Sequence, residues 1–224
     1  MALALTFDDG PGRWTAPLLD VLKNHQCRVT FFLLGANILR ECEDSDFHPR
    51  ETIVRILQEG HLVGNHTMTH TNHQTLLELR KEIEMNDALL RELYHESGVP
   101  CPKPIPYRLP FGIRTFVAGQ RAALDNRLQA LASMGWTHVH WTSILPDWEA
   151  VCQDDADCLV TLAIKHISEM TEQGLDVVFA MHDASPPGHD GPRSRKWTVY
   201  AVDKILSYAK QEGITTFQVP QVGY

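Results

Sequence analysis

The sequence lacks long apolar runs and an excess of basic residues. The longest apolar run, around residues 29–36, is far shorter than the roughly 20 residues that a membrane-spanning helix needs, so we expect no membrane span. Twenty Lys and Arg stand against 28 Asp and Glu, which gives a net charge of −8 with His neutral. Nucleic-acid binding draws its affinity from Lys and Arg at the phosphates, so this balance argues against a nucleic-acid partner.

Cysteine is also scarce. Five cysteines without Cys-x-x-Cys spacing exclude a zinc knuckle and a dense disulfide framework. Cys152 and Cys158 flank a short acidic stretch, and we expect two free thiols there rather than the alternative, a small disulfide loop.

The amino terminus lacks the basic region of a secretory signal, which predicts a cytoplasmic protein, or an extracellular one if this is a domain cut from a longer chain.

The composition that remains is that of an ordinary globular protein. The 224 residues are 43% hydrophobic and 21% charged, too apolar for disorder. A chain of this length buries roughly 70% of its unfolded surface, enough for a sizeable core. We see no repeat and no linker, so residues 1–224 are expected to form one domain.

Apolar periodicity predicts strands and helices in strict alternation. The predicted strands are Leu3–Phe7, Val29–Gly35, His61–Asn65, Pro104–Leu109, His138–Ser143, Val177–His182 and Thr215–Val219. The predicted helices are Ala16–Asn24, Glu51–Gln58, Leu76–Tyr94, Gln120–Met134, Cys158–Glu172 and Val199–Gln211. Such alternation favours an α/β fold with a parallel sheet, either a (β/α) barrel or an open doubly wound sheet. The loop over residues 184–196 is expected to form a substrate rim.

Residues of catalytic type follow five of the predicted strands. In parallel α/β folds the carboxyl ends of the strands form the ligand site, so these residues are expected to meet there. Asp8 and Asp9 end the first strand, although Asp-Gly-Pro is also ordinary turn chemistry. The others are His66 and His70, Arg108, Asp147 with Trp148, and His182.

Three more of these groups also have a second interpretation. His182, at the end of a buried apolar run, is equally consistent with a core histidine. His66 and His70 are four residues apart, which allows both rings to bind one metal ion; the alternative is a solvated histidine-rich loop. A carboxylate at a neighbouring strand end favours the metal, because zinc enzymes often use two histidines and one carboxylate. Arg108 and Asp147 can be a structural ion pair, but we favour Arg108 lowering the pKa of a carboxylate and Asp147 charging His182.

Five segments, taken in order, resemble the motifs of the NodB-homology polysaccharide deacetylases, carbohydrate esterase family 4. They are Thr6-Phe-Asp-Asp-Gly-Pro11, His66-Thr-Met-Thr-His70, Arg108-Leu-Pro-Phe-Gly112, Asp147-Trp148 and Met181-His182. The resemblance spans essentially the whole chain. It implies a distorted (β/α)7 barrel that removes acetyl groups from N-acetylated saccharides with the help of a divalent metal, most often zinc and sometimes cobalt.

The resemblance also implies a role for each matching residue. Asp8 would be the catalytic base, and Asp9, His66 and His70 would hold the metal. Arg108 would tune the base, while Asp147 would support His182 as the acid that protonates the leaving amine. The backbone N–H of Phe111 would stabilise the oxyanion, and Trp148 and Met181 would wall the pocket for the acetyl methyl group.

Three positions depart from the family pattern. Phe111 stands where Tyr is often found, and Met181 replaces a usual Leu. Ile144 stands where the family often has an Asp, which puts the loop around Asp147 and the substrate class in question more than the reaction. Two rival functions follow: the same fold acting on another amide, such as a formylated lipid-linked sugar or a cyclic ureide, and an inactive saccharide-binding module.

Overall fold

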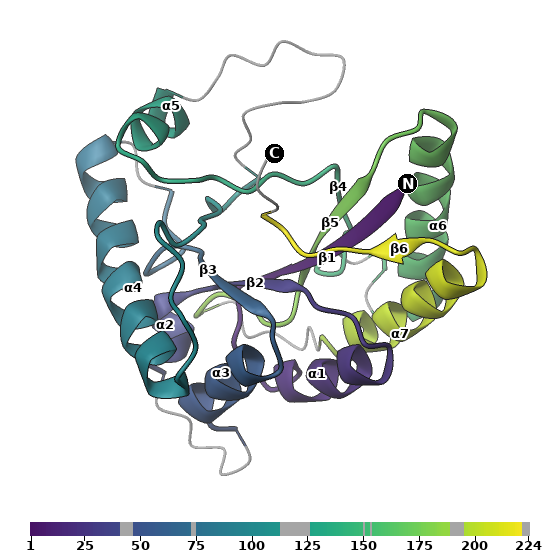
Figure 1. The fold of residues 1–224 in the computed structure, drawn as a ribbon, viewed down its shortest axis with the longest axis horizontal. Helices are drawn as coiled ribbons and strands as arrows, with labels where there is room; N and C mark the ends of the chain where they lie inside the picture. Colours follow the sequence, from purple (N-terminus) through teal and green to yellow (C-terminus); the bar gives the residue numbers. More distant parts are fainter. Residues whose placement is uncertain are drawn as a thin grey trace.

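A parallel sheet forms the centre of the molecule (Figure 1). The computed structural model describes residues 1–40, 47–72, 75–112, 126–149, 151–152, 154–188 and 195–220. The sheet order is β3-β2-β1-β5-β4, and β6 also pairs with β1. The strands are β1 (Ala2–Asp8), β2 (Thr30–Leu33), β3 (Leu62–Asn65), β4 (Ser143–Ile144), β5 (Val177–His182) and β6 (Thr215–Thr216). Every pairing in the sheet is parallel, as the alternating pattern predicts.

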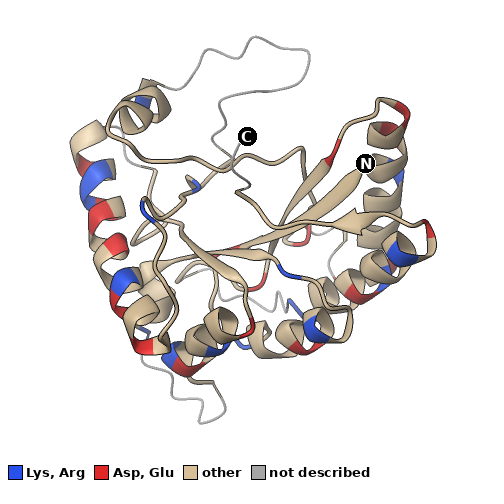
Figure 2. Ribbon diagram, viewed as in Figure 1, with Lys and Arg blue, Asp and Glu red and all other residues tan. Residues whose placement is uncertain are grey.

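Helices lie around the outside of this sheet and carry most of the charged residues in the described part of the chain (Figures 1 and 2). The long ones are α1 (Thr15–Asn24), α3 (Pro49–Gln58), α4 (Leu76–Ser97), α6 (Ala156–Glu172) and α7 (Lys196–Gln211). Two shorter ones are α2 (Gly35–Ile38), which we did not predict, and α5 (Asn126–Ser133). The predicted helix over residues 120–134 begins outside the described residues, so only its second part is seen. In the described part of the chain, no helix has both the length and the apolar character needed to cross a membrane.

Two predicted strands are reduced to single bridges. Tyr107 bridges Asn65 of β3 on one side and His138 on the other, and the chain then continues from His138 into β4, which pairs with β5. The pairing therefore runs in a ring back to β1, as in the distorted barrel that we expected. The predictions of regular strands over residues 104–109 and 138–143 are wrong. Pro104 and Pro106 have no N–H to donate to a ladder, which is one reason that pairing fails there.

Strand alternation divides the core into an inner and an outer layer. Ala4 of β1 and Val178 and Ala180 of β5 belong to a small cluster inside the ring, together with Trp141. Their neighbours along both strands belong to the large cluster that faces the helices. Since β1 and β5 pair in register, with Asp8 opposite His182, both of these residues arrive at the inner face at the carboxyl edge of the sheet.

Candidate active site

Asp8 is the last residue of β1 and is held by a buried arginine. Nη1 of Arg108 donates to Oδ1 of Asp8 at 2.8 Å and to the hydroxyl of Thr6 at 2.7 Å. The Asp8 residue is 5% exposed and Arg108 is fully buried. The structure thus pairs Arg108 with Asp8 and not with Asp147, so the alternative of an Arg108–Asp147 ion pair is wrong.

The position of Arg108 is fixed from several sides. Its Nε donates to the carbonyl of Val139 at 3.2 Å, and its guanidinium lies over the ring of Phe32, 4.2 Å from the centroid. Trp141 stacks at 5.1 Å, so aromatic faces cover the planar cation on two sides. Burial of the guanidinium lowers the pKa of Arg108, and the neighbouring Asp8 carboxylate acts to raise it. A cation held in this way keeps the Asp8 carboxylate in one orientation.

Asp9, His66 and His70 meet beside Asp8. Oδ1 of Asp9 lies 3.4 Å from Nε2 of His66 and 3.3 Å from Nε2 of His70. The three ligand atoms lie within 4.8 Å of one another. Ligand atoms bound about 2.1 Å from a tetrahedral ion are separated by about 3.4 Å, which matches these contacts.

The donor set fits a divalent ion. Oδ1 of Asp9 is buried and has no hydrogen-bond partner among the described residues. Nδ1 of His66 lies 2.9 Å from the carbonyl of Arg108, which can only accept, so this nitrogen carries a proton, and in the neutral imidazole Nε2 then has the lone pair. A carboxylate oxygen and an imidazole lone pair that face each other without a shared proton are stabilised by a cation between them.

The titration behaviour agrees with a ligand role. Burial acts to raise the pKa of Asp9, but the close contact with His66 and the charges of the neighbouring histidines lower it to about 2. Burial lowers the pKa of His70 to about 4. At neutral pH Asp9 is therefore ionised and His70 is neutral, the protonation states that metal ligands require.

Polar side chains from α2 and α4 hold the two ligand loops in place. Nδ2 of Asn37 donates to the carbonyl of Asp9 at 2.7 Å, which fixes a backbone that has a positive φ of 69°. Nδ2 of Asn86 donates to the carbonyls of Leu33 and Thr67, both at 2.9 Å. Oε2 of Glu82 accepts the backbone N–H groups of Met68 and Thr69. These contacts explain why residues 66–70 form a loop that returns toward Asp9.

His182 and Asp147 form a second, self-contained group. Nδ1 of His182 lies 2.7 Å from Oδ1 of Asp147, and the other carboxylate oxygen accepts the backbone N–H of His182 at 2.8 Å. Thr198 of α7 donates its hydroxyl to that same oxygen at 3.0 Å. Burial acts to lower the pKa of His182, but the Asp147 carboxylate more than offsets it and raises the pKa above its usual range.

These groups line one cavity of about 510 Å³. Most of its wall is apolar, supplied by Leu109, Trp141, Ile144 and Trp148. The rings of Trp148 and His182 meet edge to face with centroids 4.9 Å apart. At the mouth, Phe111 is 59% exposed and its ring lies 4.7 Å from that of His70. Seven of the ten predicted site residues therefore line this cavity, and two more, Arg108 and Asp147, are hydrogen-bonded to the lining residues Asp8 and His182.

The tenth, Met181, does not reach it. Its side chain is completely buried in the outer core cluster that faces the helices. Adjacent residues of a strand point to opposite faces, so a residue next to the inward-facing His182 has to point outward. The prediction that Met181 walls the pocket is wrong, and the apolar wall comes instead from Ile144 and the two tryptophans.

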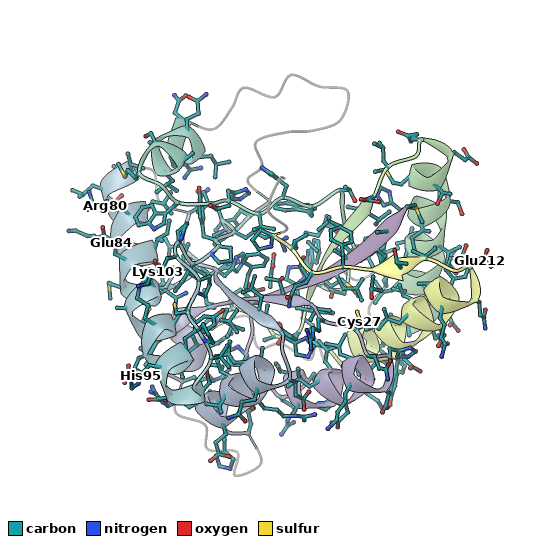
Figure 3. The ribbon with its side chains drawn as sticks, in the orientation of Figure 1. Cys27, Arg80, Glu84, His95, Lys103 and Glu212 are labelled. Atoms are coloured by element: carbon teal, nitrogen blue, oxygen red, sulfur yellow. A yellow bond between two sulfur atoms is a disulfide. The ribbon has the colours of Figure 1, made fainter. Side chains whose placement is uncertain are left out.

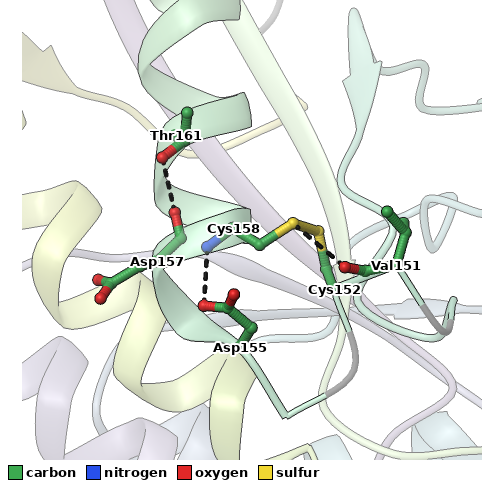
Figure 4. The surroundings of a disulfide bond; sticks show 6 residues. All are labelled: Val151, Cys152, Asp155, Asp157, Cys158 and Thr161. Carbon is green, nitrogen blue, oxygen red and sulfur yellow. Dashed lines mark hydrogen bonds between the residues drawn. A yellow bond between two sulfur atoms is a disulfide. The ribbon is translucent and has the colours of Figure 1, made fainter.

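The expectation of two free thiols at Cys152 and Cys158 is also wrong. The two cysteines form a disulfide with a Cα–Cα distance of 5.4 Å (Figure 4). Cys158 lies in the first turn of α6, where its N–H donates to the N-capping carboxylate of Asp155. The bond therefore ties the segment that follows Trp148 to the start of a helix.

Sequence reasoning missed two residues beside the site, Thr198 and Arg195. Arg195 is 4% exposed and lines the cavity directly. It lies in the stretch Pro192-Arg-Ser-Arg195, where nothing in the sequence distinguishes a buried arginine from a solvated one. The only sequence signal for Thr198 was its position immediately before the apolar residues of a predicted helix.

Comparison with known proteins agrees with this geometry. A model of the polysaccharide deacetylase family matches residues 1–139. A chitooligosaccharide deacetylase of a Bradyrhizobium strain is 30% identical over 97% of this chain and 89% of its own length. A peptidoglycan-N-acetylglucosamine deacetylase of Bacillus cereus is 29% identical over 98% of this chain and 67% of its own length. The chain belongs to the polysaccharide deacetylase family.

Solved structures of the same family share the fold. The Bc1960 peptidoglycan N-acetylglucosamine deacetylase superposes with a TM-score of 0.69 at 28% identity, over 98% of this chain and 86% of that one. The polysaccharide deacetylase Bc1974 from Bacillus cereus gives a TM-score of 0.66 at 26% identity, over 100% of this chain and 94% of that one. The α/β fold predicted from the sequence is thus confirmed.

Proposed function

We propose that this protein is a metal-dependent hydrolase that removes N-acetyl groups from saccharides of the N-acetylglucosamine type. The observation that carries the proposal is that Asp8, the Asp9–His66–His70 group and His182 line one cavity. Relatives named as chitooligosaccharide and peptidoglycan deacetylases support this substrate class. We further propose that residues 1–224 act as one catalytic domain.

Zinc is the metal that we propose, with cobalt as a substitute. Two imidazoles and one carboxylate at tetrahedral spacing are a common catalytic zinc set, which leaves a further position open. When bound, such an ion acidifies water and polarises an amide carbonyl. The hydrogen bond from His66 to the Arg108 carbonyl orients one of the rings for this role.

Asp8 is proposed as the base that takes a proton from the attacking water. Its carboxylate lines the cavity and is held in one orientation by the hydrogen bond from Arg108, so it is placed where a base could act. The neighbouring Asp9 is committed to the metal group by its contacts with both histidines. The two adjacent aspartates are thus assigned different tasks.

His182 is proposed as the acid on the other side of the reacting carbonyl. Asp147 binds Nδ1, which leaves Nε2 to carry the proton that the leaving amine needs. An amine expelled as an anion is a very poor leaving group, so this proton is essential to the cleavage step. The backbone N–H of Phe111 is proposed to stabilise the oxyanion, and Trp148 with Ile144 to bound the space for the acetyl methyl.

The experiment that tests the proposal uses metal-loaded protein. It is incubated with N-acetylglucosamine oligomers, peptidoglycan fragments and a formylated sugar, and released acetate and formate are measured. The proposal is supported if the N-acetylglucosamine oligomers and peptidoglycan fragments release acetate with the unaltered protein and release none with Asp8→Asn. Formate alone indicates the alternative amide, and no product from any substrate in a metal-replete protein indicates a binding module.

A further inference from the structure

Arg195 is a buried cation in the wall of the cavity. It is 4% exposed and immediately precedes α7. Nε donates to the carbonyl of Ala184 at 2.8 Å and Nη1 to the carbonyl of Asp147 at 2.9 Å. Nη2 donates to the hydroxyl of Ser185 at 3.1 Å. All three acceptors are neutral oxygens.

Arg195 therefore lacks the carboxylate counter-charge that Arg108 has. Arg108 forms an ion pair with Asp8 at 2.8 Å. In the described ranges, no carboxylate forms an ion pair with Arg195, and two of its five N–H donors have no acceptor there. A buried charge without a counter-charge is costly, and removing one partner of a buried pair is costly for the same reason. An anion that enters the cavity offsets that cost.

The charge of Arg195 also reaches the reacting centre. The largest influence on the pKa of His182 is burial, which lowers it; Asp147 raises it, and Arg195 acts against Asp147. Arg195 and Ser185 lie on the cavity wall that the loop after β5 supplies, while Trp141, Ile144 and Trp148 form an apolar wall. A substrate in this cavity therefore meets both an apolar surface and a cation.

We propose that the cavity selects an N-acetylated saccharide that carries a carboxylate close to the reacting N-acetyl group, and that Arg195 is the residue that determines this specificity. The inference rests on the proposed deacetylase function and narrows its substrate class. A guanidinium binds carboxylates through charge-assisted hydrogen bonds, which are about twice as strong as neutral ones. A neutral oligosaccharide offers the same N–H groups only uncharged oxygens, which give weaker hydrogen bonds and no counter-charge.

The first test needs only the unaltered protein, loaded with zinc. Three substrates of equal length are compared: a neutral N-acetylglucosamine oligomer, the same oligomer bearing ether-linked carboxymethyl groups, and the methyl ester of the second. We expect kcat/KM, measured by acetate release, to be about tenfold to a hundredfold higher for the carboxylate than for its ester, the range that a hydrogen bond to a charged group supplies. Equal values for carboxylate and ester would overturn the inference and leave the proposed function standing. Acetate from none of the three would overturn both.

The second test assigns the preference to Arg195. Arg195→Gln keeps amide donors for the neighbouring carbonyls but removes the charge. We expect the ratio of carboxylate to ester kcat/KM to fall to about one, mostly through KM of the carboxylate substrate. The matched control is Arg80→Gln on the outer side of α4, where Arg80 pairs with Glu84 at 2.6 Å (Figure 3). A ratio that stays at the unaltered value in Arg195→Gln, or falls equally in Arg80→Gln, contradicts the assignment.

Discussion

The two sides of the cavity differ in how completely the chain satisfies its own polar groups. On the side built from β1 and β3, Oδ1 of Asp9 has no hydrogen-bond partner among the described residues and faces two imidazole nitrogens. On the side built from β5, the carboxylate of Asp147 accepts from Nδ1 and the backbone of His182 and from Thr198. The first side needs a cation to be complete, and the second does not.

This difference separates a side of the cavity whose geometry is already complete from a side whose polar atoms remain available to a ligand. The side that holds His182, the proposed acid, is preformed and needs no ligand to hold its geometry, because each oxygen of Asp147 has a donor. We call it the acid side. The metal side is held at its backbone, by Asn37 and Asn86, while its side chains keep lone pairs available. A change on one side is therefore expected to spare the structure of the other.

The largest effect is expected from Asp8→Asn. The amide keeps the shape of the carboxylate and a contact with Arg108 but cannot accept a proton from water. Turnover should fall by about 10²- to 10⁴-fold, the contribution of general base catalysis. Acetate release gives the rate, and metal content by atomic absorption should stay at the unaltered value. Near-normal turnover would remove Asp8 as the base.

His66→Ala is expected to affect the metal side alone. Loss of one of three ligands should abolish stoichiometric metal binding at micromolar protein, and with it the stabilisation of about 2.7 kcal/mol that a ligand at 100 times its Kd confers. Metal content and thermal unfolding with and without a chelator measure both effects. Asp147→Asn is the matched control and should bind metal normally. An unchanged stoichiometry in His66→Ala would refute the ligand set.

Asp147→Asn is expected to break the acid side instead. The Asp147 carboxylate raises the pKa of His182, so its loss lowers that pKa, and the alkaline limb of the activity profile moves to lower pH. At pH 8 we expect activity to fall by about tenfold or more. Stability depends on pH in the same direction. The His182–Asp147 pair adds its full contribution to the free energy of unfolding below the unfolded-state His pKa of about 6.5. That contribution disappears as the pH rises through the pKa of His182 in the folded protein. A profile whose alkaline limb does not move would show that Asp147 does not charge His182.

The smallest effect on turnover is expected from Cys152→Ser. The disulfide closes a loop of few residues, so its loss should lower the free energy of unfolding by about 2 kcal/mol with little change in metal content. Denaturant unfolding and acetate release measure the two quantities. A large loss of activity would show that the bond positions Asp147 and Trp148.

Much of the site could be predicted because parallel strands deliver their last residues to one edge. Asp8, Asp9 and His182 follow apolar runs that could only be buried strands, and their meeting point follows from the topology. The pairing of Arg108 with Asp8 could not be decided from spacing, since about a hundred residues separate them and Asp147 was an equally available partner.

The errors have local physical causes. Met181 was assigned to the pocket by its place in a motif, although the period of two along β5 turns it away once His182 faces inward. The strand over residues 104–109 was predicted from its apolar content, which gives no weight to the donors that its prolines lack. Arg195 was missed because burial of a charge depends on the loop that covers it, and sequence gives no measure of that.

Arg108 contacts both the proposed base and a proposed metal ligand, the first through its side chain and the second through its backbone. Its side chain binds Asp8, while its carbonyl lies 2.9 Å from Nδ1 of His66, a proposed metal ligand. The position of this one residue therefore sets the orientation of both the Asp8 carboxylate and the His66 ring. Arg108→Lys would keep the charge and the backbone carbonyl but lose the planar set of donors that also binds Thr6 and Val139.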